Sequence, residues 1–307
     1  MTTTTERPAP AVPATSRPRR RWRPESRTMF LLIAPSVALL LLIHGFPLLD
    51  AFRQSLHDGT LINTGSFVGI QNYTDNLTSE VFWKAASFTL VFTVVGVFGS
   101  WAVGLGLALL LRTRIPARGV FKVLLLLPWV VPIVVSSTAI NWLVATSSSP
   151  IPQLFETLGL GQPLFLADPF WARILVCVFK VWISFPFMMM MSSAALASVD
   201  NSVYEAARVD GATGWQQLRW VTLPIVARST YISWILMTIF CVNDFPTIFL
   251  LTGGGPIDAT NSLVVLAYRL VFQNQQVGEG VSVAFIMTSV LVVISTLLYR
   301  QIRKAAH

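Results

Sequence analysis

Charged side chains are scarce in this sequence. They make up 12% of its 307 residues, whereas a soluble domain has about 25%. Hydrophobic residues account for 54% of the chain. A chain of this length with so little charge cannot cover its surface in water, so the composition excludes a soluble globular protein and indicates an integral membrane protein.

Cysteine and histidine are also rare. Both cysteines, Cys177 and Cys241, lie in apolar runs, where they are typical of small buried side chains and carry no information about redox compartment. The three histidines are scattered at positions 44, 57 and 307. We therefore expect no catalytic residues, no metal site and no cofactor bound by this chain.

The charge that is present is mostly basic, and the formal net charge is +8. A nucleic-acid-binding protein would gather such residues into a patch on one face. Here the basic residues lie between apolar runs instead, so we expect no nucleic acid partner and read them as signals of membrane topology.

Long apolar runs define the predicted fold, because a helix needs about 20 apolar residues to cross a bilayer. The sequence predicts an all-α integral membrane protein with six transmembrane helices. The predicted spans are about 29–51, 85–111, 120–145, 171–198, 225–251 and 280–299. The run 263–272 is too short to cross and contains Arg269, so it is expected to be an interfacial or re-entrant piece.

Two terminal segments flank the predicted membrane domain of residues 29–300. Residues 1–28 are rich in Pro, Thr and Arg and predict a disordered basic tail, and residues 301–307 form a short C-terminal end. The tail followed by the first apolar run has the order of a signal peptide. HGFPLLDAF (44–52) has no small-x-small cleavage pattern, however, so we expect the first run to be retained as a span.

Lys and Arg are distributed asymmetrically between the loops, and this predicts the orientation. Seventeen of the 22 basic residues lie in the N-terminal tail, the loop near 112–122, the loop near 200–228 and the C-terminal end. With six spans, these four segments share one side of the membrane. We therefore predict that both termini and the 200–224 loop are cytoplasmic.

The 200–224 loop contains the stretch YEAARVDGATGWQQLRWVTLP (204–224). Ser202 with Glu205 and Thr213 with Gln216 are spaced as helix capping boxes, and Gly211 between them is a natural helix stop. The pattern predicts helices at about 203–210 and 214–222, the second ended by Pro224. Such a loop could be an amphipathic helix lying on the membrane, or a structure that another protein grips.

The same stretch carries a family resemblance. EAARVDGA followed by WQQLRWVTLP resembles the EAA loop of permease subunits in binding-protein-dependent ABC importers. FVGIQNY (67–73), LLLLPWVVP (124–132) and LLTGGGP (250–256) are similar to segments of the carbohydrate-uptake branch, the maltose and glycerol-phosphate permease group. The chain departs from the pattern only upstream of the loop, where SVDNSVYEAA replaces the commoner I-P-x-x-x-x-E-A-A.

The resemblance implies a MetI-like permease bundle in a bacterial cell membrane, with the loop helix acting as a coupling helix that fits a groove on a cytoplasmic ATPase. It also implies several partners: a second permease chain, two copies of the ATP-binding subunit, which hold ATP and Mg, an extracytoplasmic solute-binding protein, and membrane lipid. The coupling residues it implies are Tyr204, Glu205, Ala206, Ala207, Arg208, Asp210, Gly211 and Ala212.

Two charged residues fall inside the predicted spans. Lys180 and Asp244 lie at similar depth, roughly 10–14 Å below the outer boundary at 1.5 Å per residue. Intramembrane charges face the bundle interior, pair, or mark a pathway. They are either a structural bridge or, with Asn243 and Trp182, the lining of a pathway for a sugar or polyol.

Two alternative functions have sequence requirements of their own. An ion-gradient-driven secondary transporter would favour inverted repeats, which the sequence does not show. An intramembrane enzyme would need paired carboxylates or a His and Cys set at one depth.

Gly96, Ser100 and Gly104 form a small-xxx-small stripe, which predicts close helix packing either within this subunit or with a partner chain.

Overall fold

The structure is a computed structural model that describes residues 25–113 and 116–305. The chain divides into two compact units, Met1–Asp50 and Ala51–His307. In the first unit the described residues are helical: α1 (Glu25–Leu40), a π segment (Leu41–Gly45) and the first residues of α2 (Phe46–Ser55). Met29–Ser55 is long and apolar enough to cross a membrane, in agreement with the first predicted span.

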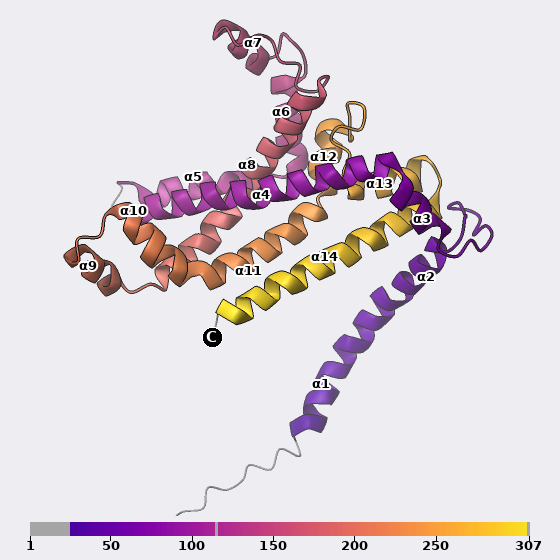
Figure 1. The fold of residues 1–307 in the computed structure, drawn as a ribbon, viewed down its shortest axis with the longest axis horizontal. Helices are drawn as coiled ribbons and strands as arrows, with labels where there is room; N and C mark the ends of the chain where they lie inside the picture. Colours follow the sequence, from indigo (N-terminus) through magenta and orange to yellow (C-terminus); the bar gives the residue numbers. More distant parts are fainter. Residues whose placement is uncertain (1–24, 114–115, 306–307) are drawn as a thin grey trace, which may run out of the picture. The chain divides into compact units, whose positions relative to one another are not determined.

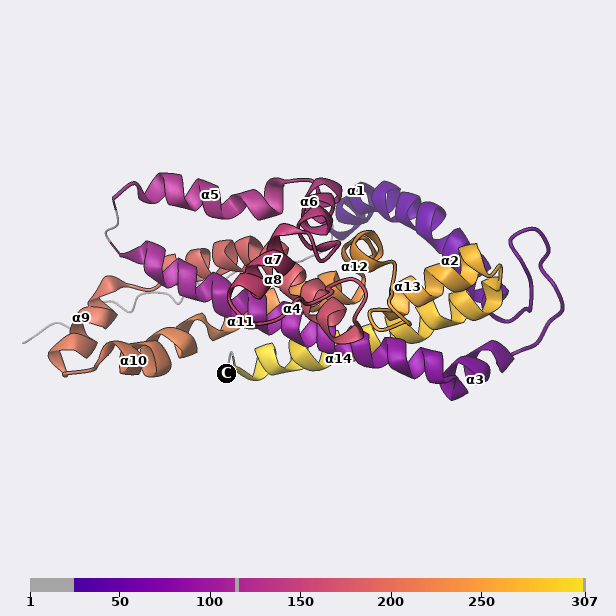
Figure 2. The ribbon, with the colours of Figure 1, turned by 90° about the horizontal axis from the view of Figure 1, so that it is seen from above.

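The second unit is a bundle of long helices that run side by side (Figures 1 and 2). Among the described residues, five helices in the chain are long and apolar enough to span a membrane, and a bent pair makes a sixth. The long helices of this unit are α4 (Glu80–Arg112), α8 (Pro169–Ala197), the continuous helix Gly214–Val242 and α14 (Val277–Ala305). The shorter ones include α3 (Gln71–Thr78), α7 (Pro150–Thr157) and α13 (Leu263–Tyr268).

The third predicted span, 120–145, is not straight. It consists of α5 (Arg118–Val130) and α6 (Ile133–Val144), which meet at an angle of 90°. Pro132 causes the break, because it has no N–H to donate and restricts the preceding residue to extended geometry. Val131 is indeed extended, with φ −67° and ψ 132°.

The fifth predicted span, 225–251, is also interrupted. Its first part, α11 (Leu223–Val242), ends before Asp244, and α12 (Phe245–Thr252) begins after it. Pro246 has no N–H to continue the ladder of α11, and the Asp244 carboxylate caps the new helix by accepting a hydrogen bond of 3.0 Å from the Thr247 backbone N–H.

Close packing of α4 on α8 forms the centre of the bundle. A Cβ atom added at Gly104 would stand 2.6 Å from the Met189 backbone nitrogen, and one at Gly96 would stand 2.7 Å from Cys241 Sγ on α11. Phe92, Met188 and Met237 are fully buried beside these contacts. The stripe of small residues therefore packs within this subunit, which decides the alternative that the sequence left open.

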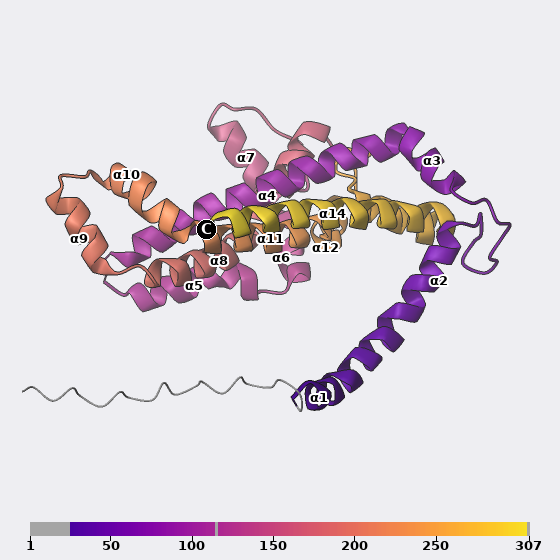
Figure 3. The same cartoon turned by 60° about the horizontal axis from the view of Figure 1, so that its bottom comes forward.

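The short apolar run 263–272 is helical, as α13 followed by a π segment (Arg269–Gln273). Leu263, Val265 and Leu266 are buried against the neighbouring helices α4 and α14. Helix α14 then runs alongside α11 toward the C-terminal end (Figures 1 and 3).

Candidate functional site

The loop between the fourth and fifth spans carries the first candidate site. Helix α9 (Asn201–Val209) lies at one end of the bundle, the end at which α4 finishes (Figures 1 and 2). The helix ends at Val209, and Gly211 follows its cap with a φ of +78°, the left-handed conformation that glycine adopts without strain. The Ala212 N–H then donates to the Ala207 carbonyl at 2.9 Å and closes a tight turn.

Two details of this loop differ from the sequence expectation. The cap of α9 is Asp200, which accepts from the Ser202 N–H at 2.9 Å, and Ser202 is already inside the helix. This hydrogen bond holds the pKa of Asp200 below its ordinary value. The second predicted capping box, Thr213 with Gln216, is present.

The helix that starts at Gly214 does not end at Pro224. It continues through α10 (Gly214–Gln216), the π segment η2 (Gln217–Thr222) and α11. In η2 the backbone bonds span five residues, so the Leu223 N–H reaches the Leu218 carbonyl. This wider turn brings Pro224 into the first turn of α11, where its missing N–H is tolerated. The predicted separate helix at 214–222 is therefore the start of the fifth span.

The predicted coupling residues divide between two faces of the loop. Tyr204, Ala207 and Ala212 are half-buried, whereas Glu205, Ala206, Arg208, Asp210 and Gly211 are exposed. Val203 and Val209 add apolar surface to the exposed side, and Val209 is 87% exposed. An exposed apolar valine next to charged side chains is a surface that a partner protein can cover.

The second candidate site is the pair of charges within the spans. Lys180 Nζ on α8 lies 2.6 Å from Asp244 Oδ2, and both side chains are 7% exposed. Asp244 also accepts from the Thr247 hydroxyl at 2.7 Å. The Phe92 ring also lies near Lys180, with its centroid 5.9 Å from Nζ. The structural bridge that the sequence allowed is thus formed, at the point where α11 is interrupted.

The other two predicted pathway residues do not join this pair. Asn243 is exposed and its Nδ2 donates back to the Ile239 carbonyl at 2.9 Å. Trp182 is 40% exposed and stacks on Phe179, with ring centroids 5.7 Å apart. Their role in a solute pathway remains a prediction.

An aromatic cluster near the interrupted helices was not singled out from the sequence. Trp129 of α5 stacks on Phe187 of α8 at a centroid distance of 5.4 Å, and Phe187 packs edge-on against Phe240 of α11 at 5.7 Å. Trp129 and Phe240 are both more than 40% exposed. The sequence signal was weak, because the three residues come from three different spans.

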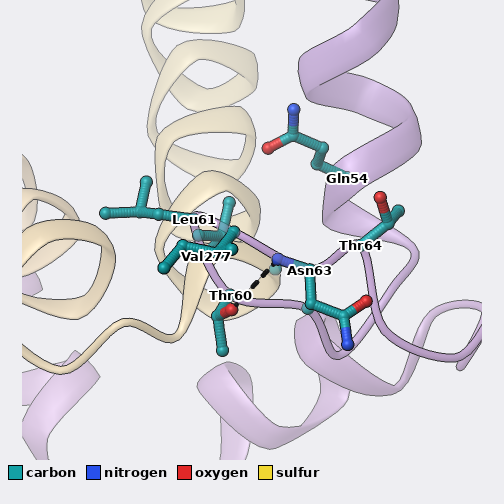
Figure 4. Close-up of a pocket in the computed structure, with 9 residues that line it drawn as sticks. Gln54, Thr60, Leu61, Asn63, Thr64 and Val277 are labelled. Atoms are coloured by element: carbon teal, nitrogen blue, oxygen red, sulfur yellow. Dashed lines mark hydrogen bonds between the residues drawn. The ribbon is translucent and has the colours of Figure 1, made fainter.

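The end of the bundle opposite to α9 carries the motifs 67–73 and 250–256. Asn72 donates to the carbonyls of Ser55 and His57, at 2.8 and 2.9 Å, and so fixes the 57–68 loop. A Cβ at Gly278 would overlap the His57 carbonyl oxygen, so the loop lies directly on the start of α14. A pocket of about 90 Å³ forms there between the loop and Val277, as Figure 4 shows.

Comparisons with known proteins identify the family. Residues 100–306 match the family described as binding-protein-dependent transport system inner membrane component. The trehalose/maltose transport system permease protein MalF of Thermococcus litoralis is 32% identical over 279 residues, covering 91% of this chain and 94% of that protein. The diacetylchitobiose uptake system permease protein DasB of Streptomyces coelicolor is also 32% identical, covering 85% of this chain and 82% of that protein.

A solved structure supports the fold. A chain of the bacterial alginate ABC transporter, crystallised in complex with an alginate pentasaccharide-bound periplasmic protein, aligns with a TM-score of 0.77 and 21% identity, covering 91% of this chain and 95% of that chain. The resemblance and the all-α permease fold predicted from the sequence are confirmed. The chain is a multi-pass membrane permease that belongs to the inner membrane components of binding-protein-dependent transport systems.

Proposed function

We propose that this ABC importer permease carries a neutral sugar or a related polyol. The named relatives support the solute class, since one transports trehalose and maltose and the other takes up diacetylchitobiose. The chain's own charges favour a neutral solute, because the buried cation at that depth, Lys180, is already engaged by Asp244. A phosphorylated solute would need a free cation to bind its phosphate.

The pathway would pass the interrupted helices near Lys180 and Asp244. Transporters bind solutes where spanning helices are discontinuous, and the described part of this chain has such breaks at 131–132 and at 243–244. The exposed rings of Trp129 and Phe240 suit the apolar faces of a sugar, while Asn243 offers hydrogen-bonding groups to its hydroxyls. We include Asn243 and Trp182, which the sequence predicted as pathway residues, along this route.

Energy would come from other chains. The assembly expected from the sequence is a second permease, two ATPase copies that hold ATP and Mg, and an extracytoplasmic solute-binding protein. The bound periplasmic protein in the alginate transporter supports the last of these. In this arrangement the termini and α9 face the cytoplasm, and ATPase closure would displace α9 and switch the pathway between outward- and inward-facing states.

A single observation carries the coupling role: α9 is a capped helix of nine residues that projects from the bundle with Glu205, Val203 and Val209 exposed. A simple tether between two spans would not need a helix with a defined start and stop. An ion-gradient-driven secondary transporter is disfavoured, because the family works with a binding protein and the relatives are ABC permeases.

Alanine substitution of Glu205 tests the coupling role. We expect Glu205→Ala to abolish ATP-dependent uptake in proteoliposomes while the amount of this chain in the membrane stays constant. Glu156→Ala, in α7 at a distance from α9, is the matched control and should transport normally. Normal uptake by Glu205→Ala would refute the assignment of α9 as the coupling helix.

A further inference from the structure

Few contacts attach α9 to the rest of the bundle. Every residue of this helix is at least partly exposed, and Tyr204 packs against a buried cluster that includes Leu105 and Val226. Beside it lies an open groove of about 560 Å³, lined by residues that include Leu109, Arg112, Tyr204 and Thr222. A force applied to α9 must therefore reach the spanning helices through the side chains that bridge this groove, or through the backbone.

Tyr204 is the central residue of this bridge. Its ring lies 4.2 Å from the Arg112 guanidinium carbon, a cation–π contact. Its hydroxyl is 3.2 Å from Thr222 Oγ1. One side chain of α9 thus contacts the end of α4, through Arg112, and the segment that leads into α11, through Thr222.

Arg112 makes a second contact with α9. It is the last residue of α4, and its Nη2 donates to Asn201 Oδ1, in the first turn of α9, at 2.8 Å. The planar guanidinium suits this double engagement, because it stacks on an aromatic face while its N–H groups donate in the plane. Lysine has neither the plane nor the fork, so it would not reproduce both contacts.

Thr222, which the Tyr204 hydroxyl contacts, lies at the end of the π segment η2. It is 2% exposed and closes the π segment η2, where its hydroxyl also bonds the Gln217 carbonyl at 3.2 Å. π segments often mark functional sites within helices. A displacement of Tyr204 would therefore be transmitted to the junction between the loop and the fifth span.

We propose that Arg112, Tyr204 and Thr222 form a mechanical linkage that transmits displacement of α9 to α4 and α11. Arg112 and Thr222 are positioning residues in this proposal, since they act through α9 and touch no solute. The inference rests on the proposed coupling role of α9 and deepens it. It predicts that breaking the linkage lets the ATPase turn over without moving solute.

The test measures solute transported per ATP hydrolysed in proteoliposomes that contain the complete transporter. For Arg112→Ala and Tyr204→Leu we expect this ratio to fall about fivefold or more, the lower end of the range for coupling between sites. In Arg112→Ala, ATP hydrolysis and the amount of copurifying ATPase should stay near those of the unmodified complex. Tyr204→Phe, which removes only the bond to Thr222, should give an intermediate ratio.

Arg118→Ala is the matched control, because this arginine also lies on the 112–118 loop but forms no hydrogen bond or ion pair with the described residues. It should keep the original ratio. If the Arg112→Ala chain does not assemble into the transporter, Arg112→Lys takes its place in the test. A lowered ratio of solute transported to ATP hydrolysed in Arg112→Lys supports the linkage. An unchanged ratio in these variants, or a proportional fall in uptake and hydrolysis, would overturn it. Absence of ATP-driven uptake in the unmodified complex would instead refute the proposed function.

Discussion

The ion pair between Lys180 and Asp244 gives the sharpest stability prediction. Removing one member of a buried pair leaves the other uncompensated, at a cost of about 3–5 kcal/mol. The two members are not equivalent here. In Lys180→Met, Asp244 keeps two donors from Thr247, whereas in Asp244→Ala the lysine loses its carboxylate partner and the Phe92 ring lies 5.9 Å from Nζ.

We therefore expect Asp244→Ala to lower the free energy of unfolding more than Lys180→Met. Asp244→Ala also removes the cap of α12, which adds about 1 kcal/mol. The combination Lys180→Met with Asp244→Ala should cost less than the sum of the two, with a coupling energy of about 2–3 kcal/mol. Thr247→Val removes only the hydroxyl donor to Asp244 and keeps the backbone hydrogen bond that caps α12, so it should cost about 1 kcal/mol.

Denaturant titration of the purified chain in detergent measures these differences. Additive losses in the double variant would refute the coupled pair. Uptake by the double variant then separates the two roles that the sequence left open. Transport that survives in the double variant makes the pair purely structural, and transport that is lost while the amount of this chain in the membrane stays constant places the pair in the solute pathway.

The remaining predictions concern close contacts and the cap of α9. Gly104→Val should destabilise the bundle by about 1–3 kcal/mol because the new side chain meets the backbone of α8. Gly106→Ala, whose new Cβ has open space around it, should be near neutral. Equal denaturation midpoints for these two variants would contradict the prediction. Gly278→Ala should release the 57–68 loop from α14 and raise its rate of proteolysis; an unchanged rate would contradict the close approach. Asp200 has a lowered pKa, so protection of the Ser202 amide from hydrogen exchange should persist down to its ordinary pKa of 3.8 and be lost below it; loss near pH 5 would contradict the cap.

Much of the fold followed from the sequence because its determinants are local. Apolar runs of about 20 residues specify spans by length alone. The turn at Gly211 and the capping box at Thr213 were predictable because the residues that make each contact are within five positions of each other. Pro132 inside the third span already indicated a kink there, whereas the break at 243–244 was missed, since hydropathy does not register a capping carboxylate inside an apolar run.

The candidate sites were less predictable, because they depend on contacts between distant residues. Lys180 and Asp244 could be placed at equal depth, but whether they meet depends on how α8 packs against α11. The stacking of Trp129, Phe187 and Phe240 requires three spans to converge. The contact of Arg112 with Tyr204 joins residues 92 positions apart, and nothing in either neighbourhood indicates the other.

Purification of the chain from mild detergent, with the copurifying proteins identified by mass, tests the central claim most directly. The account predicts a nucleotide-binding subunit and a second permease of similar size, and the accompanying solute-binding protein should be stabilised by sugars. A chain that emerges alone, under conditions that preserve related complexes, would contradict the claim that it works as one subunit of an ATP-driven sugar importer.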